Sequence, residues 1–128
     1  MKLNNDCVRD LMLLIEEEVG LNEYLSIRKI EFKNYTTEEL IYTSKKLKEA
    51  GYINAEIEDY LDGGHEAYIY SLTWQGHKFL DNIRDDGVWK TTKGIISKFS
   101  SVSISIIENV ASQVITNLIT QQMGQSIQ

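Results

Sequence analysis

TTEELIYTSKKLKEAGYI, residues 36–53, contains the signals of a helix that leads directly into a strand. Thr36 suits the N-cap position, and Glu39 three residues later completes a capping box, in which hydroxyl and carboxylate each bind a backbone N–H. Apolar side chains then recur at helical spacing. Gly51 suits the left-handed conformation that commonly ends a helix. The segment therefore predicts a helix over 37–50 followed by a strand.

Patterns on both sides of this helix predict the remaining elements. Helical spacing predicts a first helix over 5–19, capped by Asn4 and ended by Gly20. Alternation over 24–33 predicts a short strand, with a short helical turn as the alternative. The later segments are expected to form strands at 52–58 and 67–73, joined by a turn at Gly63 and Gly64, and helices at 74–86, 88–98 and 103–122.

The buried faces of the later segments follow from the same patterns. Ile53, Ala55 and Ile57 are expected to alternate inward on the first strand of the hairpin. The alternating residues of the second strand are Tyr68, Tyr70 and Leu72. In the helix that follows, Gly87 is expected to be the end, and the buried set to be Trp74, Phe79, Leu80 and Ile83.

The order helix, short strand, helix, β-hairpin, helix indicates an α+β fold with a winged-helix-like domain. We assign residues 1–87 to this domain and residues 88–128 to a helical C-terminal arm. An ordinary winged domain has one more helix before its recognition helix. Little room exists for that helix between Glu23 and Tyr35.

Composition limits the classes of function. The formal net charge is −6, and residues 1–86 contain 10 Lys and Arg against 18 Asp and Glu. This balance argues against strong binding to nucleic acid of any sequence, because phosphate contacts dominate that affinity. A single cysteine, Cys7, excludes an internal disulfide and suits the cytoplasm. No segment has the roughly 18 apolar residues of a membrane span, so no membrane partner is expected.

Duplex DNA is one candidate partner, with residues 37–50 as its recognition helix. Lysines and the tyrosine on the outward face suit contacts to phosphates or bases. Two glutamates on the same face, Glu38 and Glu49, and the acidic tip of the hairpin oppose this interpretation. The residues expected to contact DNA are Arg28, Lys29, Lys33, Tyr42, Lys45 and Lys46.

The C-terminal helix carries an apolar stripe with the 3-4-3-4 spacing of a coiled-coil seam. The seam covers about two heptads, fewer than the three or four of a sustained coiled coil. It either packs on its own domain or pairs with the same helix of a second chain. The residues of the seam, and of a homodimer interface, are Ile104, Ile107, Ala111, Val114 and Leu118.

Catalytic and metal-binding patterns do not emerge from the sequence. Cys7, His65 and His77 lack the paired spacing of a metal site, so no metal or cofactor is expected. No nucleophile elbow or phosphate-binding loop is present, and we expect a protein that is not an enzyme. Asp85 and Asp86 sit at the expected end of a helix, where acidic side chains oppose the helix dipole.

Three blocks together resemble one bacterial and phage family, the domain-of-unknown-function family 2513. They are "MKLNNDCVRDLML", "IYTSKKLKEAGYI" and "LTWQGHKFLDNIRDDGVWKTTK", and the resemblance covers roughly residues 1–105. It implies a winged-helix-like fold and frequent carriage on phages and mobile elements. It supplies no catalytic residues. The family often has proline where this chain has Asn5, a difference that concerns only how the first helix begins.

These observations favour a non-enzymatic binding module, an accessory or regulatory protein of a phage or mobile element. Two classes of partner remain open. A dimer presents the helix over 37–50 to duplex DNA, or the acidic surface binds a basic protein and DNA is not contacted.

Overall fold

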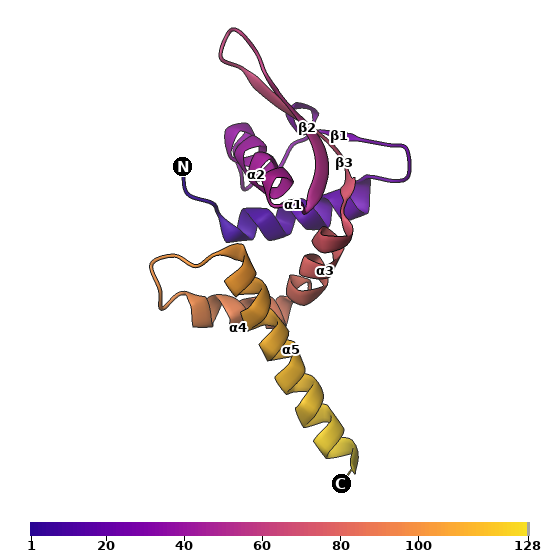
Figure 1. Ribbon diagram of the computed structural model, residues 1–128, viewed down its shortest axis with the longest axis vertical. Coiled ribbons are helices and arrows are strands. Elements are labelled where there is room, and N and C mark those ends of the chain that lie inside the picture. The colour runs from indigo at the N-terminus through magenta and orange to yellow at the C-terminus, as the bar shows by residue number, and fades with distance from the viewer. Residues whose placement is uncertain (128) are drawn as a thin grey trace. The chain divides into compact units, whose positions relative to one another are not determined.

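The computed structural model describes residues 1–127, which form an α+β fold with five α-helices and one three-stranded antiparallel sheet (Figure 1). Two compact units are present, Met1–Leu80 and a second unit that begins at Asp81. The boundary lies before the expected one after residue 87. The elements are α1 (Asn5–Glu18), β1 (Leu25–Ser26), the 3₁₀ turn η1 (Ile27–Lys29), α2 (Thr37–Glu49), β2 (Ile53–Asp59), β3 (His65–Leu72), α3 (Trp74–Ile83), α4 (Asp86–Ile96) and α5 (Ile104–Ile127).

The first unit packs α1 and α2 against the sheet, whose strand order is β1-β3-β2. This arrangement is consistent with a small winged-helix-like domain, as the sequence predicts. The expected strand over 24–33 is reduced to Leu25–Ser26, and the chain then makes the alternative short turn, η1. The fully buried side chains in the core of the first unit include Cys7, Leu11, Met12, Ile27, Leu47 and Ile69.

Helix α2 is present as predicted, with its glycine cap and the hydroxyl half of its capping box, but the Glu39 carboxylate bonds a side chain instead of a backbone N–H. Thr36 Oγ1 accepts a hydrogen bond from Glu39 N at 3.1 Å, and the Glu39 carboxylate accepts one from Asn4 Nδ2 at 2.9 Å. Gly51 has φ +80°, with its N–H donating to Lys48 O and Tyr52 N–H donating to Leu47 O. This pair of bonds defines a Schellman motif, which turns the chain from the helix into β2.

The hairpin of β2 and β3 extends from the helices of the first unit (Figure 1). Tyr68 and Tyr70 are wrong as inward residues, because Ala67 and Ile69 occupy the buried positions of β3. A bulge opposite Asn54 and Ala55 adds one residue to β3 and reverses the alternation. Leu72 therefore faces inward as expected.

The two helices expected at 74–86 and 88–98 are present as α3 and α4, and the break between them lies before Gly87. Thr73 caps α3, with Gly76 N donating to its hydroxyl at 3.0 Å. Helix α3 ends at Ile83, and Gly87 lies in the first turn of α4. Asp85 is the N-cap of α4, so both acidic side chains at 85 and 86 favour its dipole and the expected conflict disappears. Trp74 is 79% exposed, and its expected burial is wrong.

In the second unit, α4 and α5 pack against each other. The buried side chains of α4 are Val88, Trp89, Thr92 and Ile96. Helix α5 continues for several turns past α4 (Figure 1). Over the described residues, no helix is both long enough and apolar enough to cross a bilayer.

Candidate functional site

A groove of about 360 Å³ lies between α2 and the hairpin in the first unit. Arg28, Tyr42 and Lys45 line it, so the structure brings together three of the six residues expected to contact DNA. Lys29, Lys33 and Lys46 are not among its lining residues. The other lining residues are Met1, Glu38, Ile41, Ile57, Asp59, Gly63 and His65.

Arg28 is fixed in this groove by β3. Its Nε donates to the carbonyl oxygen of His65, and its backbone N–H donates to Glu66 Oε1 at 3.1 Å. Glu66 is only 5% exposed and also accepts hydrogen bonds from Ser26 Oγ at 2.8 Å and from Ala67 N at 2.8 Å. Such a buried carboxylate is stable only when donors surround it. Glu66 therefore joins η1 to the sheet and positions Arg28.

Sequence patterns gave no indication of this role for Glu66. The residue lies beside the exposed turn of the hairpin, where a carboxylate is ordinary. Its burial comes from Ser26 and Arg28, which are distant in sequence and cover it only after β1 pairs with β3.

Three side chains on the outward face of α2 make contacts within the chain. Tyr42 donates its hydroxyl hydrogen to Met1 O at 2.7 Å. Lys46 Nζ lies 2.9 Å from Glu49 Oε2 and 5.6 Å from the centre of the Tyr42 ring. The hydrogen bond between the two side chains raises the pKa of Lys46 and lowers that of Glu49. Both groups are solvent-exposed, so this ion pair adds little stability, but it offsets the charge that phosphate would meet.

The hairpin is acidic, and its Asp59 lies in the groove beside α2. Residues 53–72 contain no Lys or Arg, and their carboxylates are Glu56, Glu58, Asp59, Asp62 and Glu66. His65 Nδ1 lies 2.6 Å from Asp59 Oδ1, within the groove lining. Across the whole first unit, 9 Lys and Arg stand against 15 Asp and Glu.

The outer face of the sheet carries exposed aromatic side chains. The Tyr24 ring lies 6.0 Å from the Tyr68 ring and 6.2 Å from the Tyr70 ring. Tyr24 is 58% exposed and Tyr70 is 42% exposed. Monomeric proteins seldom gather exposed aromatic residues unless they bind something there. Individual sequence positions do not reveal this cluster, because pairing of β1 with β3 creates it.

The structure divides the predicted seam of α5 into two parts. Ile107 and Ala111 are buried, while Ile104 and Val114 are partly exposed. Leu118 is 51% exposed. The middle of the seam is thus covered within the chain, and Leu118 is the most exposed of its five residues.

The described residues contain no group of three or more His, Cys, Asp and Glu side chains suited to a metal ion. Cys7 is buried, and Thr43 donates to its sulfur at 3.4 Å. Burial raises the pKa of the Cys7 thiol to about 11, which disfavours a nucleophilic thiolate. Asp81 lies 3.1 Å from the guanidinium of Arg84, and Asp85 caps α4 through Val88 N.

The architecture and these surfaces define a small α+β protein with a winged-helix-like first unit. The chain belongs to the family described as hypothetical protein (DUF2513), whose model matches residues 2–103. It is 35% identical over 121 residues to an uncharacterized protein of Haemophilus influenzae, with 93% of this chain and 99% of that protein covered. No solved structure matches the chain. The predicted resemblance is confirmed.

Proposed function

We propose that this protein is a non-enzymatic binding module that recognises a basic segment of a protein partner. The observation that carries the proposal is the charge of the β2–β3 hairpin, which has five carboxylates and no Lys or Arg. In a winged helix that contacts DNA, the corresponding hairpin usually supplies cations to phosphates.

The cations near the hairpin strengthen this proposal. Arg28 donates to a backbone carbonyl of β3, and Lys46 is paired with Glu49. Lys45 shares its groove with Glu38 and Asp59. Each neighbouring carboxylate reduces the favourable release of counterions that phosphate binding provides. A basic peptide would be attracted by the same carboxylates, because its positive charges complement this surface.

The test measures binding of a labelled lysine- and arginine-containing peptide by fluorescence anisotropy at about 50 mM salt. The hairpin variant Glu58→Gln, Asp59→Asn, Asp62→Asn should weaken binding at least about tenfold, because three favourable charge interactions are lost. The matched control, Glu17→Gln, Glu18→Gln, Glu31→Gln, removes the same charge from exposed sites elsewhere. Equal losses in both variants would show attraction to net charge alone, and absence of binding to the wild-type protein would refute the proposal.

Duplex DNA is the second candidate, favoured by the groove that contains Arg28, Tyr42 and Lys45. Lys29 and Lys33 would extend its cationic surface. This candidate predicts retardation of duplex DNA in low salt that weakens steeply as salt rises, and its loss in Lys45→Glu, Lys46→Glu. Unchanged DNA mobility at about 50 mM salt would exclude it.

Two further parts of the proposal concern context. We infer residence in the cytoplasm, supported by the single reduced Cys7, and an accessory role in a phage or mobile element, supported by family resemblance. Neighbouring genes of phage type across relatives would support this role. We also infer a homodimer through α5, whose described residues after Glu108 carry no charge that would repel a second copy.

A further inference from the structure

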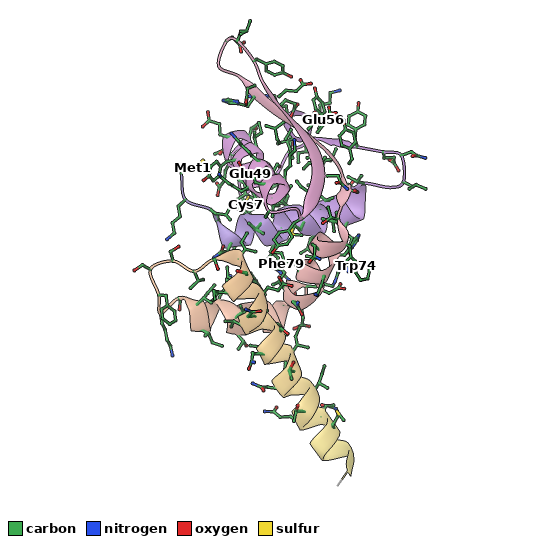
Figure 2. The ribbon with its side chains drawn as sticks, viewed as in Figure 1. Met1, Cys7, Glu49, Glu56, Trp74 and Phe79 are labelled. Atoms are coloured by element: carbon green, nitrogen blue, oxygen red, sulfur yellow. The ribbon has the colours of Figure 1, made fainter. Side chains whose placement is uncertain are left out.

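The outer face of the sheet combines tyrosine rings with carboxylates on the adjacent strand. Tyr24 contacts the rings of Tyr68 and Tyr70, as described above. Glu56 pairs directly with Tyr68 across β2 and β3, and it is labelled on the hairpin in Figure 2. Glu58 lies two residues further along β2, on the same face. We call these five residues the tyrosine face.

One carboxylate of this surface already accepts a hydrogen bond from within the chain. Tyr60, in the turn of the hairpin, donates to Glu58 Oε2 at 2.9 Å. Burial and the neighbouring Glu56 raise the pKa of Tyr70, so its hydroxyl remains protonated. The rings therefore offer neutral, electron-rich faces beside negative carboxylates.

A shallow depression of about 430 Å³ continues from this surface along β2. Glu56 and Tyr70 line it together with the backbone segment 53–55 and Lys48. The strand order places β2 at an edge of the sheet, where an extended chain can lie alongside. Residues that flank a docked side chain can bind in this depression. Lys48 would repel a second cation there.

We propose that the tyrosine face binds an arginine side chain within an extended basic segment of a partner protein. This inference rests on the proposed function and adds the location and the preferred residue. A planar guanidinium stacks on a tyrosine ring and at the same time donates paired hydrogen bonds to a carboxylate. A lysine ammonium is a strongly hydrated point charge and makes this combination less well.

The experiment compares two labelled peptides, an alternating Arg-Gly hexapeptide and an alternating Lys-Gly hexapeptide, by anisotropy with the full chain. We expect the arginine peptide to bind about fivefold more tightly, the gain available from an exposed cation–π contact. The variant Tyr24→Ala, Tyr70→Ala should abolish this preference. The control Trp74→Ala removes an exposed aromatic residue outside the tyrosine face and should preserve it.

Each outcome has a separate meaning. Equal binding of both peptides to the wild-type protein would overturn the tyrosine face and leave the basic-partner function intact. If neither peptide binds, the proposed function itself fails. Binding of oligo(dT) that is lost in the tyrosine variant would instead show stacking of bases, which also overturns the inference. Glu56→Gln provides a second test that keeps the rings, and it should weaken the arginine peptide more than Glu17→Gln does.

Discussion

Gly76 offers a sharp test of how the first unit is assembled. Residue 76 lies in the first turns of α3, where the helix approaches the start of β2. A Cβ placed on Gly76 would lie 3.0 Å from the carbonyl carbon of Tyr52 and closer still to its oxygen. That oxygen accepts a hydrogen bond from Thr73 N at 3.0 Å. The substitution Gly76→Ala therefore forces backbone against backbone, and a change of rotamer cannot relieve it.

The expected magnitude follows from three contributions. Overpacking a well-packed site costs about 1–3 kcal/mol. Displacing Tyr52 O weakens a hydrogen bond worth about 1 kcal/mol. Alanine recovers about 1 kcal/mol through its higher helix propensity. The net prediction is a loss of about 1–3 kcal/mol in the free energy of unfolding of the first unit.

Urea unfolding followed by circular dichroism measures this loss. Gly94→Ala is the matched control, since Gly94 lies inside α4 with nothing near its ideal Cβ. It should stabilise its unit by about 0.5–1 kcal/mol. The same chemical change thus has opposite signs at the two positions. A midpoint for Gly76→Ala at or above the wild-type value would refute the proposed close approach.

Three further predictions test other parts of the chain. Asp85→Ala removes the acceptor for Val88 N and should cost the second unit about 1 kcal/mol in thermal or urea unfolding, whereas Asp81→Ala, at an exposed ion pair, should cost less than about half of that. The buried Cys7 thiol, with its pKa raised from 9.0 to about 11, should react with a thiol reagent at pH 8 only as fast as the protein opens. Because the thiol ionises at lower pH in the unfolded chain, its contribution to the free energy of unfolding should be lost as pH rises from 9 to 11. This loss should be absent in Cys7→Ala, and coinciding pH profiles of the two proteins would refute the prediction. Leu118→Asp should convert the proposed dimer to a monomer, as measured by sedimentation. A wild-type protein that is already monomeric at high concentration would refute the proposed dimer.

The parts of the fold that the sequence predicts well are those determined by near neighbours. The caps of α2 by Thr36 and Gly51 lie within one segment and form as expected, whereas Glu39 bonds the distant Asn4 side chain instead of the backbone of its own helix. The phase of β3 depends instead on a bulge, which no local alternation of Tyr68 and Tyr70 reveals. Asp85 was misinterpreted for a related reason, because its role depends on where α3 stops.

The candidate sites show the same division between local and distant interactions. Arg28, Tyr42 and Lys45 line one groove, and the sequence placed them on one surface. Their availability depends on residues far away in sequence, such as Glu66 and the His65 carbonyl beside Arg28. Sequence position can thus predict which side chains face the same way. Which of their charges remain unpaired for a ligand depends on contacts that form only in the folded chain.

The position of α2 and its chemistry therefore argue for different partners. A recognition helix needs cations that remain free when the hairpin closes beside it. Here Lys46 is paired with Glu49, and the hairpin adds carboxylates without a compensating Lys or Arg. Substitutions could change the charges of α2 and the hairpin without changing the fold, because the core and the caps involve other residues. The same backbone can consequently serve DNA in one sequence and a basic protein segment in another, and the hairpin carboxylates favour the second use for this chain.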